Sequence, residues 1–358
     1  MPVQSLPAGE ALARLDTFDT IIDARTEDEH ALDHVPGAVN WPTLNNAERI
    51  TIGTMYKQVN AFEAKKRGAA LAARNIAAHI ERELLDKPKG WKPLVYCWRG
   101  GNRSGALATI LGAIGFQVTL IEGGYKAWRA ALVESLPALA NRLHYRVVCG
   151  PTGSGKTRLL QALAAEGAQV LDLEALASHR SSVLGHIPGV EQPSQKRFDS
   201  LIWSALRGFD PEHPVYVESE SKKVGNVRVP DALIDAMRQS PCIDLRLADR
   251  ERVALLLEDY DFFVTDPAFF CRRLEALVEL RGKAVVQDWT ERVQRGETPS
   301  VVLDLLTQHY DPMYAQSIAR NFVRFGQALR CELPERSPQS LREAARHLLA
   351  LEAVAEPA

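Results

Sequence analysis

The sequence has no long hydrophobic run and no recognisable sorting signal at its start. No apolar stretch reaches the roughly 18 residues that a membrane-spanning helix needs. The first segment does not combine a basic start, an apolar core and a small-residue cleavage site. Both absences argue against a membrane-spanning or secreted class, and we expect a cytoplasmic protein with no membrane partner.

The chain is also poor in net charge and in cysteine. Its 43 Lys and Arg residues nearly balance its 45 Asp and Glu residues, so the formal net charge is −2. Any nucleic-acid surface must therefore be a local basic patch. The five cysteines are an odd number without a CxxC pair, which predicts neither a disulfide framework nor a zinc site. Free thiols are expected, and a reactive one must be identified from its surroundings.

Short apolar runs alternate with helical patterns, which indicates parallel sheets covered by helices. The pattern begins at Thr20 and restarts at residues 144–150, so two successive α/β domains are expected. Pro137 interrupts a helical pattern near the junction, and the chain after residue 251 is mainly helical. The expected domains are 1–138 and 139–358. Strands are expected within 20–25, 93–98, 118–123, 144–150, 168–174, 214–220 and 242–248, and helices over 60–85 and 104–114.

One cysteine stands in a setting that predicts chemistry. In "LVYCWRGGNRSG", Cys97 ends an apparent strand and Ser104 opens an apparent helix. The loop N–H groups and the helix N-terminus of such a unit form a cradle for an anion, and the same field favours a thiolate. We predict that Cys97 is a nucleophile with a lowered pKa and that Arg103 is its catalytic partner. The anion loop is predicted to comprise Trp98, Arg99, Gly100, Gly101, Asn102 and Ser104.

Two families use this design. Cysteine-based phosphatases have a C-x5-R loop, whereas rhodanese sulfurtransferases usually have a C-x4-R loop that holds a persulfide. The spacing from Cys97 to Arg103 is that of the phosphatases. However, "IIDARTEDEHALDHVPGAVNWP" (21–42) and "LIEGGYKAWR" (120–129) resemble parts of a rhodanese-like domain that covers about residues 5–135. The additional loop residue leaves room for a tetrahedral oxyanion beside the sulfur, which predicts a phosphate-bearing donor.

A second phosphate-binding motif follows. The stretch "GPTGSGKT" (150–157) fits the Walker A pattern of P-loop NTPases, after an apolar run and before a helical pattern. The backbone of such a loop cradles a diphosphate, Lys156 reaches its terminal oxygens, and Thr157 can hold Mg²⁺. The predicted diphosphate-binding residues are Gly150, Thr152, Gly153, Ser154, Gly155, Lys156 and Thr157.

Other polar residues are candidates for assistance with phosphate, metal or RNA. Asp172 and Glu218 end neighbouring apparent strands, where an acidic residue often assists the metal, although an exposed structural carboxylate fits equally well. Arg180 lies in the polar loop 177–189, and Lys222 lies in a basic segment that follows Glu218. A plain surface loop is an equal alternative for residues 177–189.

The segment 247–260 resembles the arginine-bearing segment with which nucleotide kinases close over phosphates. It nominates Arg250 and Arg252, although pairing with acidic neighbours on a helix surface is an equal alternative. Arginines are also scattered through the helical region, with aromatic residues among them. These aromatic residues could stack on RNA bases, but a place in the hydrophobic core fits them better. These aromatic residues are Trp203, Tyr260 and Trp289.

The order of the two motifs resembles the tRNA 2-selenouridine synthase family over nearly the whole chain. The resemblance is also carried by residues 45–58, 170–185 and 215–230. It implies a transferase that replaces sulfur by selenium in wobble 2-thiouridine of tRNA, with selenophosphate as donor. It also implies geranylation of that sulfur from geranyl diphosphate before selenation. The expected partners are therefore tRNA, selenophosphate and geranyl diphosphate, with no tightly bound cofactor and with Mg²⁺ as a candidate ion.

On this interpretation, Cys97 attacks the selenium of selenophosphate and a Cys97-bound selenium intermediate forms. The P-loop holds geranyl diphosphate, with ATP and an RNA phosphate as alternatives. Three other classes stay open: a cysteine-based phosphatase, a P-loop kinase or ATPase with a regulatory rhodanese-like domain, and a thiosulfate sulfurtransferase. A phosphoester assay and an ATP turnover measurement would separate the first two.

Overall fold

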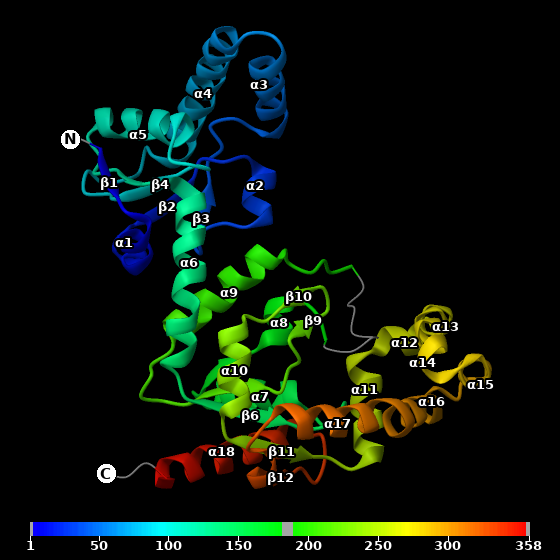
Figure 1. The fold of residues 1–358 in the computed structure, drawn as a ribbon. Coiled ribbons are helices and arrows are strands. Elements are labelled where there is room, and N and C mark those ends of the chain that lie inside the picture. Colours follow the sequence, from blue (N-terminus) through cyan, green and yellow to red (C-terminus); the bar gives the residue numbers. More distant parts are fainter. Residues whose placement is uncertain (1–2, 181–188, 356–358) are drawn as a thin grey trace. The chain divides into compact units, whose positions relative to one another are not determined.

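The computed structural model describes residues 3–180 and 189–355 (Figure 1). The chain forms two compact units. The first unit comprises Met1–Leu136 and Pro193–Ser204, and the second comprises Pro137–Gln192 and Ala205–Ala358. The predicted α/β class with a helical C-terminal part is confirmed. The sequence suggested a division into 1–138 and 139–358. The structure differs from it in that residues 193–204 also belong to the first unit.

The first unit is built on a parallel five-stranded sheet with the order β1-β5-β4-β2-β3. All four residues of the central strand β4 are buried, as expected of a parallel strand that is covered on both faces. Its strands are β1 (Gln4–Leu6), β2 (Thr20–Asp23), β3 (Ala38–Asn40), β4 (Pro93–Tyr96) and β5 (Thr119–Ile121). Its helices are α1 (Ala8–Ala13), η1 (Leu15–Thr17), α2 (Glu27–Leu32), α3 (Asn46–Gln58), α4 (Ala61–Glu83), α5 (Asn102–Ile114) and the first part of α6 (Gly124–Asn141).

Pro137 does not interrupt a helix, contrary to our expectation, because it lies inside the continuous helix α6. Proline cannot donate to the carbonyl group four residues earlier, which is that of Val133. Val133 and Pro137 are both exposed, so water can satisfy this carbonyl group. The division between the two units nevertheless falls at this point.

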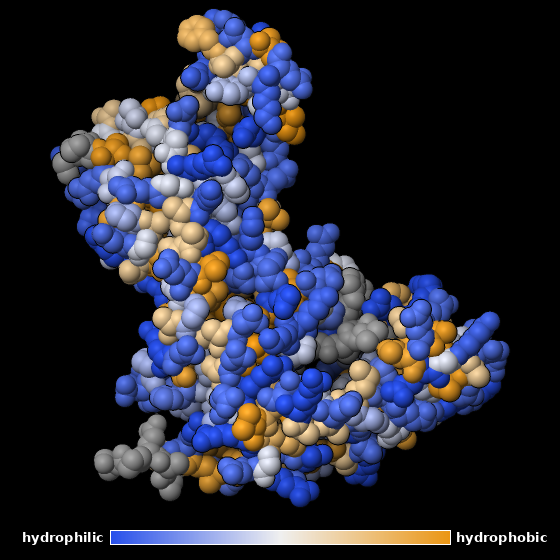
Figure 2. Space-filling view, in the orientation of Figure 1, coloured by the Kyte–Doolittle hydropathy of each residue, from blue (hydrophilic) through white to orange (hydrophobic). Residues whose placement is uncertain are grey.

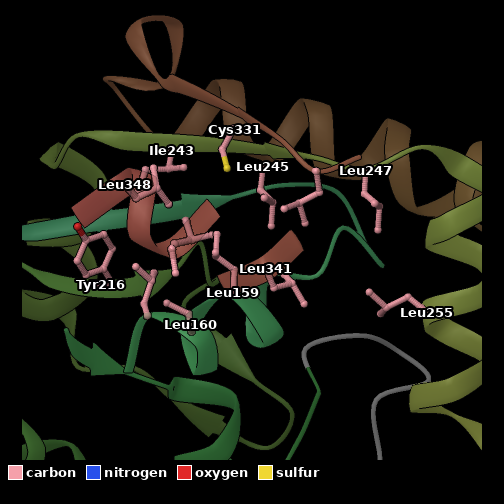
Figure 3. Packing of buried hydrophobic residues seen from close by; sticks show 14 residues of the cluster. Leu159, Leu160, Tyr216, Ile243, Leu245, Leu247, Leu255, Cys331, Leu341 and Leu348 are labelled. Atoms are coloured by element: carbon pink, nitrogen blue, oxygen red, sulfur yellow. The ribbon is translucent and has the colours of Figure 1, made fainter. Parts of the chain in front are cut away.

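The second unit contains a parallel five-stranded sheet with the order β12-β11-β6-β8-β7. Leucines from α7 and α18 pack against β6, β8, β11 and β12 in its core (Figure 3). The strands are β6 (Tyr145–Cys149), β7 (Gln169–Leu171), β8 (Val215–Glu218), β11 (Cys242–Arg246) and β12 (Leu329–Glu332), beside a small hairpin of β9 (Lys223–Val224) and β10 (Val227–Arg228). The helices of this unit outside its helical part are α7 (Lys156–Ala165), α8 (Leu173–Ala177), α10 (Asp231–Gln239) and α18 (Pro338–Ala355). Helix α9 (Gln195–Gly208) belongs to the first unit up to Ser204, and only its end belongs to the second.

The helical part has its own core around Phe270, Trp289 and Leu306. It contains a π-helix, η3 (Leu305–Tyr310), and such helices are rare and frequent at functional sites. No helix in the described part of the chain is long and apolar enough to cross a membrane. The remaining elements are α11 (Asp249–Asp259), α12 (Asp261–Thr265), α13 (Pro267–Leu274), η2 (Glu275–Leu277), α14 (Val278–Arg281), α15 (Lys283–Gln294), α16 (Thr298–Asp304), α17 (Asp311–Asn321) and η4 (Phe325–Gln327).

Candidate active site

The Cys97 loop connects the end of β4 to the start of α5. Helix α5 begins at Asn102, two residues before Ser104. The Cys97 Sγ accepts hydrogen bonds from Gly101 N at 3.3 Å and from Ser104 Oγ at 3.1 Å. Among the described residues, the amide groups of the three residues after Cys97 have no hydrogen-bond acceptor. The loop therefore combines a hydrogen-bonded sulfur with N–H groups that remain available to an anion.

These contacts shift the pKa of the Cys97 thiol. Burial alone would raise the pKa of its thiol. The hydrogen bonds from Ser104 and Gly101 and the positive charge of Arg103 outweigh burial, so the pKa lies below its usual value. The structure thus supports the sequence-based expectation of an activated thiolate.

We expect Ser104→Ala to raise the pKa of Cys97, because it removes the hydroxyl donor nearest the sulfur. A hydrogen bond to a charged group contributes about 1.5–3 kcal/mol, so the midpoint of the pH–rate profile for alkylation should move up by about one to two pH units. Thr109→Ala is the matched control, since Thr109 is on the same helix and donates to Gly105 O instead. Equal midpoints for the two variants would contradict the assignment of Ser104.

Arg103 reaches the loop indirectly. Its guanidinium group donates to Glu29 Oε2 at 2.6 Å and to Glu29 Oε1 at 3.3 Å, and Glu29 belongs to α2. The charge of Arg103 still lowers the pKa of Cys97, but no direct contact with the sulfur is present. Arg99 and Asn102 are exposed on the loop. The residues of the predicted anion loop therefore lie in one strand–loop–helix segment, and its Arg103 is paired with Glu29.

The start of α6 closes against the Cys97 loop. Tyr125 N donates to Cys97 O at 2.8 Å, and Lys126 N donates to Trp98 O at 3.1 Å. Gly124 has φ +61°, and a Cβ atom there would lie 2.3 Å from Cys97 O and 2.5 Å from Gly100 N. Only glycine allows this close approach of the two backbones.

Gly124→Ala is accordingly expected to destabilise the first unit by about 2–4 kcal/mol, through backbone strain and a direct clash. Gly105→Ala is the matched control, because nothing lies within 4 Å of its added Cβ and its helical conformation suits alanine. Chemical unfolding monitored by tryptophan fluorescence will measure both variants. A stability of Gly124→Ala equal to that of the control would show that the loop can shift without cost.

A buried ion pair supports the loop from behind. Arg25 Nη2 lies 2.6 Å from Asp23 Oδ2 and donates to Asp33 O at 2.6 Å. The guanidinium group also lies 4.0 Å from the ring centre of Tyr125, whose hydroxyl group donates to Asp33 Oδ2 at 2.6 Å. This network holds Tyr125 in place, and the Tyr125 N–H group donates to Cys97 O. The sequence showed Asp23 and Arg25 at the end of a strand but not this link.

The segment that returns to the first unit adds a residue that sequence reasoning missed. The ring of Trp98 stacks on Tyr125 with 5.4 Å between centres, and Lys196 Nζ lies 5.8 Å from the Trp98 ring centre. Arg129 of α6 forms an ion pair with Asp199 of α9. Nearly a hundred residues separate Lys196 from Trp98, so no local pattern signals their proximity.

The P-loop lies between β6 and α7, as predicted. Gly155 has φ +90° directly before the helix, and Lys156 Nζ donates to Gly150 O at 2.7 Å. Gly150 N donates to the hydroxyl group of Tyr314 at 2.6 Å. Tyr314 belongs to α17, and no local sequence pattern indicates that it meets this loop.

The acidic residues around Thr157 differ in their suitability for a cation. Thr157 Oγ1 donates to Glu174 Oε2 at 3.2 Å, and Glu174 N donates to Glu218 Oε1 at 2.9 Å. Burial, followed by the charges of Glu220, Glu174 and Asp172, raises the pKa of Glu218 well above its usual value. Asp172 caps α8 through Ala175 N, and burial raises its pKa too.

No group of three or more His, Cys, Asp or Glu side chains suited to a metal occurs in the described ranges. Thr157 and Glu174 nevertheless offer two oxygen atoms, which fits Mg²⁺ because this ion usually takes its other ligands from water and substrate phosphate. Glu174 was not among the residues that the sequence nominated. It could have been found as the next acidic residue after Asp172.

The basic residues that the sequence nominated differ in exposure and in their partners. Arg252 is buried, and all of its donor nitrogens are engaged by Thr152 O, Asp249 and Asp311. It therefore ties the P-loop to α17. Arg250 is 85% exposed and lies beside Glu251, and Lys222 forms an exposed ion pair with Asp231.

Arg180 donates to Asp259 O and lies 4.6 Å from the ring centre of Tyr260. Both Arg180 and Tyr260 line the cavity next to the P-loop. Trp203 and Trp289 are core residues, each 1% exposed. The part of the polar loop 177–189 from 181 to 188 lies outside the described residues.

This cavity has a volume of about 710 Å³, and both polar and apolar side chains line it. Lys156, Thr157, Asp172 and Glu174 are among its polar lining residues. Its apolar lining residues include Leu255 and Leu256 of α11, Met313 and Ile318 of α17, and Phe322 directly after α17. Such a lining can receive a ligand that carries both a phosphate and an apolar group.

The two units define a protein class in which a rhodanese-like cysteine-loop domain is joined to a P-loop domain. Residues 7–131 match the rhodanese-like domain family, and residues 143–269 match the family described as the tRNA 2-selenouridine synthase AAA domain. The N-terminal domain of a putative ATP/GTP binding protein from Clostridium difficile 630 is 33% identical over 36% of this chain and 97% of its own, with a TM-score of 0.31.

Two relatives carry the name tRNA 2-selenouridine synthase. The protein from Nitrosomonas europaea is 35% identical over 72% of this chain and 67% of its own length. The protein from Aeromonas salmonicida is 30% identical over 90% of this chain and 94% of its own. The chain belongs to the tRNA 2-selenouridine synthase family.

Proposed function

We propose that this chain replaces sulfur by selenium in wobble 2-thiouridine of tRNA, with selenophosphate bound at the Cys97 loop and geranyl diphosphate bound at the P-loop. The observation that carries the proposal is the pair of loops whose geometry suits phosphate. One contains a nucleophile with a lowered pKa, and the other contains a lysine and a threonine but no nucleophile. The names of the relatives support tRNA as the substrate.

The electron count restricts what Cys97 can do to selenophosphate. Selenium in selenophosphate and sulfur in a thiolate are both fully reduced. A bond between them would need the removal of two electrons, or the release of phosphorus as phosphite. The Cys97-bound selenium intermediate therefore needs either an external oxidant or the release of phosphite. A step that needs neither is attack on phosphorus.

In the balanced step, Cys97 Sγ attacks phosphorus. A sulfur–phosphorus bond forms, the selenium–phosphorus bond breaks, and selenium leaves with the bonding pair as hydroselenide. Gly101 and Ser104 stabilise the thiolate before attack, and the loop amides and Arg103 stabilise the phosphoryl oxygens. This use of the loop suits its C-x5-R spacing, since the sulfur then acts on a tetrahedral phosphoryl group.

The remaining steps also balance. Hydroselenide adds to C2 of the S-geranylated uridine, and the sulfur leaves as geranyl thiol with one proton. Water then cleaves S-phosphocysteine to inorganic phosphate and the Cys97 thiolate. The loop that accepts the phosphoryl group is thereby regenerated.

The mixed lining of the cavity beside the P-loop supports geranyl diphosphate as its ligand. Lys156 would hold the diphosphate as the allylic carbon is attacked by the thiocarbonyl sulfur, and Thr157 and Glu174 would hold Mg²⁺. The ion would neutralise charge on the leaving diphosphate. Apolar lining residues such as Met313 and Ile318 of α17 would contact the isoprenoid chain.

The test is mass spectrometry of nucleosides from a 2-thiouridine-containing tRNA incubated with the full chain. Geranyl diphosphate alone should give the S-geranylated nucleoside. Selenophosphate should add the selenium nucleoside only when geranyl diphosphate is also present. Absence of any selenium nucleoside with both donors would refute the proposed function.

A further inference from the structure

The helical hairpin formed by α3 and α4 exposes large apolar side chains at its tip, residues 56–67. Helix α3 has no buried residue. Tyr56, Val59 and Phe62 are 53%, 74% and 66% exposed. Hydrophobic side chains among hydrophilic ones are visible over α3 and α4 in Figure 2. Clustered exposure of this kind marks an interaction surface.

The hairpin is also basic in an otherwise balanced chain. Residues 49–67 contain five Lys or Arg residues and one acidic residue, Glu63, a local net charge of +4 against −2 for the chain. Lys66 pairs with Glu63 at 2.6 Å, and its Nζ lies 5.2 Å from the ring centre of Phe62. The other basic residues of this stretch are Arg49, Lys57, Lys65 and Arg67, all exposed.

Hydrogen bonds connect the base of the hairpin to helix α2. Asn46, the first residue of α3, donates its N–H to Glu27 Oε2 at 3.0 Å and accepts from Asp28 N at 3.1 Å. Both acidic residues are on α2. The next residue of α2, Glu29, holds Arg103 of the Cys97 loop. The base of the hairpin is therefore linked through α2 to Arg103 of the Cys97 loop.

We infer that the hairpin tip binds the tRNA substrate. Its basic side chains contact phosphate groups, and Phe62 or Tyr56 stacks on an unpaired base, since cations interleaved with exposed aromatic rings are how proteins hold single-stranded RNA. Two copies of the tip would bring like charges together, which disfavours self-association. The inference rests on the proposed function, because that function supplies tRNA as the substrate.

The test compares tRNA binding by matched variants over a series of salt concentrations. Phe62→Ala is paired with Leu85→Ala, and Lys65→Glu with Lys89→Glu. Leu85 is 82% exposed and Lys89 is exposed, and both follow the other end of α4. Phe62→Ala should weaken binding about tenfold. Lys65→Glu should weaken it most at low salt and reduce the salt slope by about one, whereas both controls should stay within about twofold of the parent chain.

Each outcome has a separate meaning. If the parent chain fails to bind tRNA, the proposed function fails together with this inference. If it binds and the tip variants behave like their controls, the inference alone is wrong. A change in sedimentation without a change in tRNA affinity would assign the tip to self-association, which also overturns it. Release of hydroselenide from selenophosphate without tRNA, with an unchanged unfolding midpoint, will show that the variants are folded.

Discussion

Cys97→Ala is expected to abolish selenation of tRNA, by at least about a thousandfold, and to leave geranylation intact. The substitution removes the only nucleophile of the loop, and the residual anion site cannot break the selenium–phosphorus bond. Nucleoside mass spectrometry will measure both products in one digest. Cys271→Ala is the matched control, because Cys271 is half-buried in the other unit and burial raises its pKa.

The same experiment distinguishes attack on phosphorus from attack on selenium. Rapid acid quenching of the parent chain with selenophosphate should trap a phosphoryl group on the peptide that contains Cys97. A selenium adduct on that peptide would refute the phosphoryl route while leaving the proposed overall reaction in place. Selenation that persists in Cys97→Ala would remove Cys97 from the reaction altogether. A simple phosphatase would instead hydrolyse phosphoesters and make no selenium nucleoside.

Lys156→Ala is expected to lower geranyl transfer by about a hundredfold or more, and selenation of the 2-thiouridine substrate should fall with it. Lys156 Nζ lies over the P-loop, where it donates to Gly150 O and Pro151 O. Its loss would leave the charge of the departing diphosphate unstabilised. Formation of S-phosphocysteine from selenophosphate should be unchanged, because that step belongs to the first unit.

The matched control is Lys283→Ala, an exposed lysine at the start of α15 that does not line the cavity. If Lys156→Ala transferred the geranyl group as fast as the control, the P-loop would have to be reassigned to ATP or an RNA phosphate. Supplying tRNA that is already geranylated separates the two sites further, since Lys156→Ala should then make the selenium nucleoside at the parent rate.

The sequence predicted the parts of the site that are local in the chain. Cys97, Ser104 and the P-loop residues lie within short strand–loop–helix units, where spacing determines geometry. The loop arginine was predicted, but its partner Glu29 lies on a helix 74 residues earlier. The contact of Tyr314 with Gly150 of the P-loop and that of Lys196 with Trp98 also join residues far apart in the chain. No residue pattern encodes which distant helix meets a loop.

The arginines show why residue type alone was insufficient. Arg250 and Arg252 lie on one helix in a segment that resembles a phosphate-closing element. Arg252 is instead surrounded by Thr152 O and two carboxylates, and Arg250 points to solvent. A guanidinium group contacts phosphate only if its other partners leave donors free. The number of free donors on each arginine can be counted only in the tertiary structure.

The return of residues 193–204 to the first unit has a consequence for biosynthesis. Trp203 donates its Nε1–H to Ser135 Oγ at 3.0 Å, and Phe198 and Trp203 are fully buried. A ribosome that has completed residue 138 has therefore not yet supplied the whole first unit. The nascent chain must carry the P-loop and two strands of the second sheet out of the exit tunnel before the first unit can close. A fragment ended at residue 138 lacks residues 193–204 of the first unit, and we expect it for that reason to be prone to aggregation.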